Sequence, residues 1–430
     1  MFHSTPVRSI EQRRSLITRR RVQFQGALLM SALLPYLLRS LISQGTYDDA
    51  TSLNSFVGNI AAVIIALWVR TSIETFPGVR SSSLNLPVAF VAHGIVVAGV
   101  ALFRLPYDRL ELVGGFLFHL LWLYIVYFVV QRRARMTIAI APFGKIATLA
   151  TVDRVDWVML LAPELRQVPP CDAIVADFGA DLPPQWEAFL ADAALDGRIV
   201  YQVKQLSESL TGRVEIEHIS ENSFGSLLPA RGYFHLKELA DLLTSLVLLP
   251  LLTPVLLVTA LAIKLEDGGP VLFRQRRIGH SGHSFDVCKF RTMRVVDPAV
   301  MSDARLSAMT GDKDERITRV GAFLRRTRID ELAQLWNIVR GEMSWIGPRP
   351  EAEILSVWYT DEIPFYRYRH VVKPGISGWA QVNQGHVAGV ADVDRKLQYD
   401  FYYIKYFSPW LDLLIVFRTI RTLFTGFGAR

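Results

Sequence analysis

The sequence has 430 residues, of which 51% are hydrophobic and only 20% carry a charged side chain. This balance excludes an ordinary soluble protein and indicates an integral membrane protein with folded parts outside the bilayer. The net charge of +7 favours anionic lipids or phosphorylated substrates as partners. Nucleic acid is the weakest partner class, because the sequence has several apolar segments and no recognisable nucleic-acid motif.

The cysteines and the N-terminus indicate where the chain resides. Cys171 and Cys288 are the only cysteines, and they lie far apart in the sequence. Their spacing indicates neither a disulfide framework nor a metal cluster, so we expect the folded parts to face a reducing compartment. The basic N-terminus leads into a long apolar segment without a clear cleavage site, which predicts an anchor rather than a cleaved signal peptide.

Residues 1–135 contain four apolar segments, each approaching the ~20 residues that a membrane-spanning helix needs. The segments are approximately Phe24–Ile42, Leu53–Val69, Leu86–Phe103 and Leu110–Val130. Arginines cluster before the first and after the fourth, whereas the loop 43–52 has no lysine or arginine. The positive-inside rule therefore predicts that both ends of this region lie in the cytoplasm and that four helices cross the membrane.

Residues 136–230 have a different character. Short buried strands are predicted at 136–141, 155–162, 173–177 and 199–203, with a helix at 185–195. This alternation predicts a small, Rossmann-like α/β domain with a largely parallel sheet. Pro142-Phe143-Gly144-Lys145 follows the first strand in place of a G-x-G-x-x-G motif, which argues against a nucleotide site. A structural or oligomerisation module is the preferred interpretation.

The last part, residues 231–430, opens with an apolar run, Leu242–Ile263, that is long enough to span a bilayer. Pro250 and Pro254 lie near its centre, where proline kinks a helix, and Thr253 can satisfy backbone groups that proline frees. A fifth crossing would place the arginine-rich remainder outside the cytoplasm, whereas nucleotide-activated substrates are cytoplasmic. We therefore predict a re-entrant helix-break-helix, and a kinked spanning helix is the alternative.

An adjacent pair of carboxylates, Asp330 and Glu331, follows a basic amphipathic segment at 316–328. Neighbouring side chains on a helix diverge by about 100°, so we expect one carboxylate to face a substrate or metal and the other to pair with an arginine. Two carboxylates among many cations suit phosphate chemistry, through a divalent metal or through covalent attack. A surface ion pair is the alternative.

Arg349 lies between two prolines in the stretch Gly347-Pro348-Arg349-Pro350. The prolines restrict the backbone and lower the entropy that is lost when the guanidinium group is fixed. A preorganised guanidinium group suits bidentate binding of phosphate. A structural turn with an exposed arginine is the alternative.

Three further stretches complete the pattern. Residues 285–293 alternate apolar and polar side chains and predict a strand, next to a basic stretch. The glycine-rich stretch 373–382 predicts a loop that leads into a short strand. Residues 411–424 predict an amphipathic helix on the membrane, with Arg418 and Arg421 on its polar side.

The order of these motifs resembles that of the bacterial sugar transferases, monotopic phosphoglycosyl transferases that start exopolysaccharide or O-antigen synthesis. The matching motifs, in chain order, are the proline-broken apolar run, FRQRRIG, FDVCKFRTM, RIDELAQLWNIVRGEMSWIGPRP, VKPGISGWAQV and YDFYYIKYFSPWLDLL. They cover about residues 233–425, and the architecture of residues 1–230 resembles the long-form members of the family. Thr253-Pro254 and Ala333 depart from the family pattern, because many relatives have Ser-Pro and Pro there.

The resemblance implies an undecaprenyl-phosphate hexose-1-phosphate transferase. Asp330 matches the family's nucleophile, which attacks the β-phosphate of a UDP-hexose and releases UMP, after which undecaprenyl phosphate accepts the sugar-phosphate. Glu331 would be the dyad partner, and Asp330 and Glu331 would together hold Mg²⁺. Arg349 would contact phosphate or nucleotide, and Asp400 matches an acidic position near the family's active site. The other expected substrate-binding residues are Arg276, Lys289, Arg291, Arg328 and Gln381.

The resemblance also implies a fold class and a location. The protein is expected to be a membrane protein of mixed α and α/β class, with four transmembrane helices at 1–135 and a small α/β domain at 136–230. A monotopic catalytic domain at 231–430 would contain the re-entrant helix, broken at Thr253 and Pro254, and amphipathic interfacial helices in contact with membrane lipids. We expect a homodimer in the bacterial inner membrane, with the catalytic domain on the cytoplasmic face.

Two readings without catalysis are open as alternatives. One is a non-catalytic membrane scaffold of a polysaccharide assembly complex, and the other is a lipid-binding anchor that uses its basic helices electrostatically. Neither needs Asp330, Glu331 and Arg349 together, so the presence of all three favours an enzyme.

Overall fold

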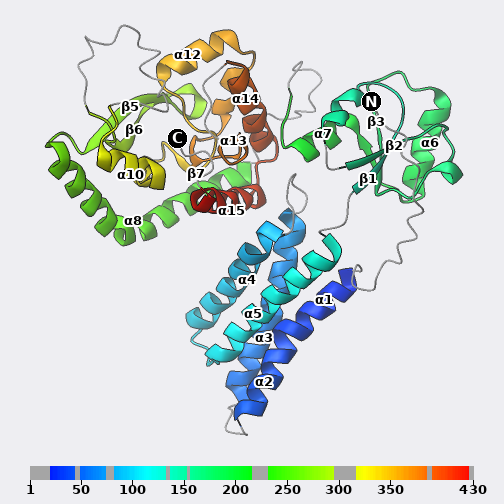
Figure 1. Ribbon diagram of the computed structural model, residues 1–430, viewed down its shortest axis with the longest axis horizontal. Helices are drawn as coiled ribbons and strands as arrows, with labels where there is room; N and C mark the ends of the chain where they lie inside the picture. The colour runs from blue at the N-terminus through cyan, green and yellow to red at the C-terminus, as the bar shows by residue number, and fades with distance from the viewer. Residues whose placement is uncertain are drawn as a thin grey trace. The chain divides into compact units, whose positions relative to one another are not determined.

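The computed structural model in Figure 1 describes most of the chain. The described residues are 20–43, 49–73, 82–131, 136–152, 155–215, 231–294, 316–384 and 390–425. Contacts within the chain divide it into two compact units, Met1–Gly212 and Arg213–Arg430. The first unit contains the N-terminal apolar helices and the α/β part, and the second contains every residue expected at the active site.

The first unit begins with apolar helices. They are α1 (Arg20–Leu28) and α2 (Leu34–Ser43), joined by a π-helical turn, then α3 (Asp49–Ile73), α4 (Ser82–Leu102) and α5 (Arg109–Val126), which a second π-helical turn extends to Gln131. Four candidate membrane spans result, with α1 and α2 forming one of them. The expectation of four N-terminal apolar helices is confirmed.

Small and polar residues bring these helices together. Asn59 of α3 donates a hydrogen bond to the carbonyl of Glu111 in α5 (3.2 Å). A Cβ atom on Gly115 would lie 2.2 Å from Asn59, so glycine is required where α3 and α5 approach each other. Asp108 caps α5 by accepting from the amide of Glu111 (2.9 Å), and it also accepts from Arg39 (2.8 Å). Close approach and interhelical hydrogen bonds are the usual means of helix association in lipid.

The α/β part contains a parallel sheet between helices. Its elements are β1 (Met136–Ile140), β2 (Val155–Met159), β3 (Ala173–Ala176), α6 (Pro184–Leu195), β4 (Val200–Gln202) and α7 (Val203–Thr211). The strand order is β2-β1-β3-β4, and α6 and α7 cover opposite faces (Figure 1). Alternation along β1 explains this, because Ile138 and Ile140 pack on the α7 side and Ala139 on the α6 side. The predicted strands and helix are confirmed.

A carboxylate of the chain itself lies at the carboxyl edge of this sheet, between β1 and β3. Asp177 accepts hydrogen bonds from the amides of Lys145 (2.8 Å) and Gly179 (3.0 Å). A Cβ atom on Gly144 would lie 2.3 Å from the Asp177 carboxylate. Open α/β sheets bind ligands at this kind of edge, where strand order reverses. Here Asp177 already uses the amides, in agreement with the missing G-x-G-x-x-G motif.

The second unit starts with one long helix and continues as a mixed fold. Its elements are α8 (Arg231–Asp267), β5 (Leu272–Ile278), β6 (Ser284–Phe290), α10 (Arg319–Thr327), α11 (Leu335–Val339), β7 (Ser344–Ile346), α12 (Glu353–Glu362), β8 (Gly375–Ser377), α13 (Trp379–Gln384), α14 (Val390–Lys405) and α15 (Pro409–Thr425). β5 and β6 form an antiparallel hairpin, and β7 pairs in parallel with β8. The predicted strand at 285–293 is confirmed as β6.

The helix α8 is continuous for 37 residues and contains both Pro250 and Pro254. The hydroxyl of Thr253 donates to the carbonyl of Leu249 (2.7 Å). The expected interruption at Thr253 and Pro254 is therefore absent: the backbone stays helical, and Figure 1 shows one ribbon that bends between its ends. A bend without an interruption is a known outcome of proline in an apolar helix, where side-chain hydroxyls take up freed backbone groups.

One prediction in the second unit is wrong and another is modified. Residues 379–384 form the helix α13, not a strand. Trp379 at its start is buried and stacks on Tyr402 of α14, with 5.6 Å between ring centroids. Arg418 of α15 lies 4.4 Å above the same ring and donates to Asn383. Arg418 thus packs within the unit, instead of projecting from a solvated side of an interfacial helix.

Candidate active site

The carboxylate pair lies in a 3₁₀ helix, Ile329–Gln334, between α10 and α11. Arg328 ends α10 in the left-handed conformation (φ 60°), which reverses the chain and returns Ile329 to the apolar cluster around Phe290. The pair is buried, with Asp330 8% and Glu331 6% exposed. Successive side chains in a 3₁₀ helix diverge by about 120°, so the expected difference in surroundings still holds.

Three cations from three elements meet at one oxygen of Glu331. Its Oε1 atom accepts from Arg349 (2.7 Å) and lies 3.5 Å from the Lys289 ammonium and 3.6 Å from the Arg328 guanidinium. Burial alone raises the pKa of Glu331, but Arg349, Lys289 and Arg328 outweigh it and hold the pKa well below its usual range. Glu331 is therefore a fixed negative charge that orients the cations.

Asp330 has the opposite environment. Within the described residues, its Oδ1 atom is buried and has no hydrogen-bond partner. Burial and the neighbouring Glu331 raise its pKa. In the same 3₁₀ helix, the side-chain Nε2 atom of Gln334 is also buried and has no partner in the part of the chain that the structure describes. An unpaired buried acceptor and an unpaired buried donor are costly, and their presence in one turn marks a place where a polar ligand would bind.

The ammonium group of Lys289 has a pKa near neutral pH. Burial and the nearby Arg349 lower its pKa to about 7, against the opposing effect of Glu331. Arg349 differs, because its ion pair with Glu331 raises the pKa of the guanidinium group. Arg349 is thus a permanent cation of the site, and Lys289 is a cation whose charge depends on pH.

Two arginines fix the backbone around Arg349 by donating hydrogen bonds to its carbonyl groups. The carbonyl of Arg349 accepts from Arg369 (2.8 Å), and the carbonyl of Pro350 accepts from Arg277. Arg369 forms a buried ion pair with Asp400 (2.8 Å). Asp400 therefore lies behind the loop and reaches Arg349 through Arg369, and it does not face the carboxylate pair in these contacts.

The remaining predicted residues make contacts elsewhere in the unit. Arg276 donates to Ser284 (2.8 Å) and is exposed. Arg291 pairs with Asp267 and so ties the end of α8 to β6. Gln381 donates to the carbonyl of Ile376 (3.0 Å). The structure thus gathers Lys289, Arg328 and Arg349 around Glu331 and places Arg276, Arg291, Gln381 and Asp400 in other roles.

Arg277, Arg369 and Asn337 support the site and were missed in the sequence. Arg277 was detectable, because Phe273 pairs with Lys289 across the hairpin, and residues 273 and 277 share one face of β5. Asn337 accepts from the amide of Cys288 (3.0 Å) and donates to the carbonyl of Asp286 (2.7 Å), which fixes α11 against β6. Nothing local in the sequence indicates the roles of Asn337 and Arg369.

The expected Mg²⁺ can be tested against the donors present. Within the described residues, no group of three or more His, Cys, Asp or Glu side chains is arranged to hold a metal ion. Mg²⁺ often uses one or two carboxylates together with substrate phosphates, and the unpaired oxygen of Asp330 fits that need. Glu331 fits less well, because three cations already surround its Oε1 atom.

Comparison with known proteins assigns the chain to a family. Residues 232–426 match the profile described as bacterial sugar transferase. Over 408 residues, 95% of each chain, the sequence is 43% identical to UDP-N-acetylgalactosamine-undecaprenyl-phosphate N-acetylgalactosaminephosphotransferase of Aeromonas hydrophila. The chain belongs to the bacterial sugar transferase family. The family prediction is confirmed, and with it the prediction of a transferase.

Other relatives match this sugar transferase over a shorter stretch. The UDP-glucose:undecaprenyl-phosphate glucose-1-phosphate transferase of Escherichia coli (strain K12) is 42% identical over 194 residues, which are 45% of this chain and 40% of that protein. The exopolysaccharide production protein PSS of Rhizobium leguminosarum bv. phaseoli is 40% identical over 190 residues, 43% of this chain but 93% of its own. These lengths correspond to that of the family match in the second unit.

Proposed function

We propose that the protein transfers a sugar-1-phosphate from a UDP-sugar to undecaprenyl phosphate, releases UMP, and so starts the synthesis of a polysaccharide. The observation that carries the proposal is the unpaired, buried oxygen of Asp330 beside a Glu331 that holds three cations. The names of the relatives give the substrate classes. A scaffold or an anchor would not need an unpaired buried carboxylate oxygen.

In the first step, an oxygen of Asp330 attacks the β-phosphorus of the UDP-sugar. The bond between that phosphorus and the bridging oxygen breaks, and UMP leaves with the electron pair. The sugar-phosphate is then an acyl phosphate on Asp330. Arg349, Lys289 and Arg328 are positioned by Glu331 to offset the charge of the diphosphate and of the departing UMP. Mg²⁺ held by Asp330 and the substrate phosphates would neutralise further charge.

In the second step, a phosphate oxygen of undecaprenyl phosphate attacks the same phosphorus. The acyl phosphate bond breaks, and Asp330 recovers its carboxylate. The products balance: UDP-sugar and undecaprenyl phosphate become UMP and a lipid-linked diphosphate sugar. Gln334, whose buried Nε2 atom is unpaired, is placed in the same turn to donate to a phosphate oxygen or to the sugar.

For the sugar we propose N-acetylgalactosamine, with glucose as the second candidate. The Aeromonas relative, which its name assigns to N-acetylgalactosamine, matches along 95% of this chain. The glucose-type relative of Escherichia coli matches along 45% of it at nearly the same identity. Under this proposal, the expected hexose is an N-acetylhexosamine.

We further propose a membrane arrangement in which the first four apolar helices cross the inner membrane and α8 enters and leaves on the cytoplasmic face. Both halves of α8 pack against the folded remainder of the second unit. Asp241 in the first half accepts from Ser344, and Ile263 in the second half packs with Phe290 and Leu324. One folded unit cannot lie on both sides of a bilayer, which supports re-entrance. A homodimer stays part of the proposal, and a mass measurement in native lipid that finds only monomer would overturn it.

The function is tested by UMP release from a panel of UDP-sugars, with undecaprenyl phosphate and Mg²⁺. We expect release with UDP-N-acetylgalactosamine by the wild type and by the control Asp361→Ala, an exposed aspartate of α12, and none by Asp330→Ala. Incubation with the donor alone should add the mass of one sugar-phosphate to the wild type. Release by Asp330→Ala would mean that another group is the nucleophile. No UMP release by the wild type with any donor would favour the non-catalytic scaffold.

A further inference from the structure

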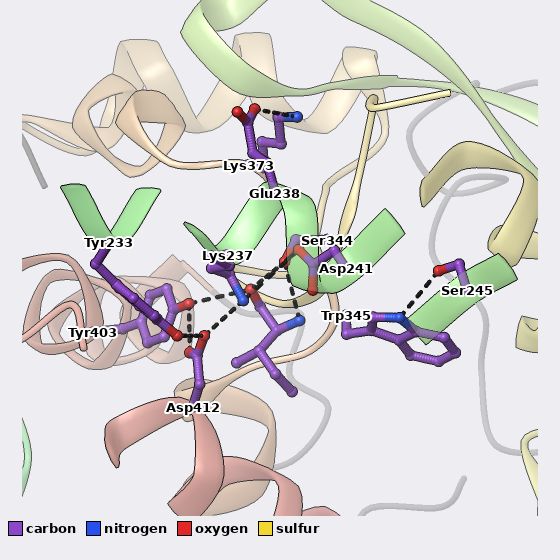
Figure 2. A network of polar contacts seen from close by, with 11 residues as sticks. Tyr233, Lys237, Glu238, Asp241, Ser245, Ser344, Trp345, Lys373, Tyr403 and Asp412 are labelled. Carbon is purple, nitrogen blue, oxygen red and sulfur yellow. Dashed lines mark hydrogen bonds and ion pairs between the residues drawn. The ribbon is translucent and has the colours of Figure 1, made fainter. Parts of the chain in front are cut away.

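The helix α8 carries a polar stripe in its N-terminal half, beside a separate ion pair of Glu238 with Lys373 (2.6 Å) (Figure 2). Tyr233, Lys237, Asp241 and Ser245 recur every four residues, so they share one face over three turns. Figure 2 shows these side chains pointing toward residues of β7, α14 and α15. Beyond Ser245, residues 246–263 expose mainly apolar side chains, such as Val247 (69%) and Leu251 (70%). Charged and polar groups on a membrane helix are costly unless they are satisfied, so the stripe calls for a role.

Asp412 of α15 is the centre of the network. Its Oδ2 atom accepts from the Tyr233 hydroxyl (2.6 Å) and from the Lys237 ammonium (2.6 Å), and its Oδ1 atom accepts from the Tyr403 hydroxyl (2.8 Å). Lys237 also lies 3.9 Å from Asp241. The Lys237 and Asp412 side chains are only 9% and 12% exposed. A buried charge pair of this kind is weak support for stability, and its best attested use is to fix one arrangement among several.

Each residue of β7 bonds to the stripe or to Tyr403, as Figure 2 shows for Ser344 and Trp345. Ser344 donates to Asp241 (2.6 Å), and the indole of Trp345 donates to Ser245 (3.1 Å). The carbonyl of Ile346 lies 3.1 Å from the Tyr403 hydroxyl, which donates to Asp412. β7 leads through Gly347 and Pro348 into Arg349, the arginine on Glu331. The stripe is therefore joined by hydrogen bonds to the strand that directly precedes the Arg349 loop.

We propose that the α8 stripe is a positioning device that fixes the depth and rotation of the membrane helix relative to β7, and thereby the reach of the active site to the lipid acceptor. An apolar helix gains little from one depth over a neighbouring one, because sliding in the bilayer costs little. Directional bonds from Asp241, Ser245 and Lys237 select a single position. These are positioning residues, since none of the contacts described for them involves Asp330 or Glu331.

This inference rests on the proposed function, and it predicts different effects of the stripe on the two steps of the reaction. The UDP-sugar is soluble and reaches Asp330 from water whatever the depth of α8. The phosphate of undecaprenyl phosphate is confined to the membrane interface, so its approach to Asp330 depends on that depth. Loss of the stripe should therefore impair transfer to lipid and spare the exchange of labelled UMP into UDP-sugar, which needs only the first step.

The test replaces both members of the central pair, Lys237→Met with Asp412→Leu. Removing one member alone would leave a buried unpaired charge, whereas replacing both with apolar residues of similar size preserves folding. The matched control is Lys264→Met with Asp361→Leu, the same replacements at exposed positions of α8 and α12. In lipid nanodiscs we expect UMP exchange to be retained and lipid transfer to fall at least about tenfold, because a misplacement of about 1 Å can cost about a hundredfold in rate. Equal losses in both assays, or no loss, would overturn the proposal.

A second measurement does not depend on turnover. A fluorescent label on Leu251→Cys, in a background lacking Cys171, is quenched by lipids brominated at known depths. We expect one depth in the parent and in the control, and a shifted or broadened depth in Lys237→Met with Asp412→Leu. An unchanged depth would overturn the positioning role. If the wild type neither exchanges UMP nor transfers to lipid, the proposed function fails, and the depth measurement still decides the role of the stripe.

Discussion

Asp330 and Glu331 are adjacent in sequence, yet their surroundings shift their pKa values in opposite directions. Burial raises the pKa of both carboxyl groups. Around Glu331, Arg349, Lys289 and Arg328 outweigh burial, whereas Asp330 also meets the negative charge of Glu331. Neighbouring titratable groups with separated pKa values commonly divide the work of an active site. In the proposed mechanism, Glu331 supplies the fixed charge and Asp330 the reacting oxygen.

The lowered pKa of Lys289 predicts a pH dependence. Its value of about 7 means that Lys289 is a cation below pH 7 and loses its charge as the pH rises through 7. We expect kcat/KM for the UDP-sugar to fall over the same range, because kcat/KM reports ionisation in the free enzyme. Lys289→Arg keeps a cation at every pH and should remove this fall. UMP release measured from pH 6 to 9 in both proteins checks this, and identical profiles would contradict it.

The ion pair of Arg369 and Asp400 predicts a structural effect that carries through to activity. Asp400→Asn removes the nearer counter-ion of the buried Arg369, leaves Glu351 at 4.0 Å, and should lower the free energy of unfolding by about 3 kcal/mol. Arg369→Met with Asp400→Leu should regain stability but not activity, because the carbonyl of Arg349 then lacks its donor. Thermal unfolding and UMP release measure both. A raised KM for the donor with unchanged stability would instead make Asp400 a substrate contact.

At the scale of elements, hydrophobic patterns predict the strands and helices whose burial follows from their own sequence. The strand β3 is a continuous apolar run and β1 is apolar apart from Thr137, as expected for parallel strands covered on both faces. The helix α13 was missed, because six residues show no clear period and its burial depends on α14 and α15, which are distant in sequence. The same limit applies to the interior position of Arg418.

The site shows the same division between local and distant information. The carboxylates and Arg349 were found from residue type and from the flanking prolines. Which other cations join them depends on the pairing of β5 with β6, which selects the face of Lys289 and Arg277 over that of Arg276. The path from Asp400 through Arg369 to the carbonyl of Arg349 joins three separate segments, and no local pattern indicates it.

The re-entrant course of α8 predicts a labelling pattern. Leu265, near the end of α8, is 77% exposed, and Arg132, outside the described residues, follows the fourth apolar helix. If α8 returns to the cytoplasmic face, cysteines introduced at both positions should react with a membrane-impermeant reagent added from that side. Reaction only at position 132 would instead show that α8 spans the membrane. Cysteine introduced at Thr51, in the first turn of α3 at the end expected on the far side, serves as the unreactive control.

At the scale of the whole molecule, the relatives match different lengths of the chain, from 190 to 408 residues. The Rhizobium relative matches 190 residues of this chain with 93% of its own length, so a protein of about the size of the second unit exists in the family. The Aeromonas relative matches along 95% of both chains, so its match includes the first unit. The carboxylate pair, its cations and the α8 stripe all lie in the second unit.

Residues 213–430 are therefore expected to suffice for the chemistry. All contacts of Glu331 and Asp412 described above are internal to this unit, so its removal from the first unit breaks none of them. We expect the isolated unit to release UMP and to transfer sugar-phosphate to undecaprenyl phosphate in nanodiscs, with both activities lost in Asp330→Ala. Rates within about tenfold of the full chain would fit an intact site, because each tenfold corresponds to only about 1.4 kcal/mol of barrier. A folded but inactive fragment would show that the first unit contributes to catalysis. Its contribution would then not act through any of the contacts described for the carboxylate pair, because all of them lie within the second unit.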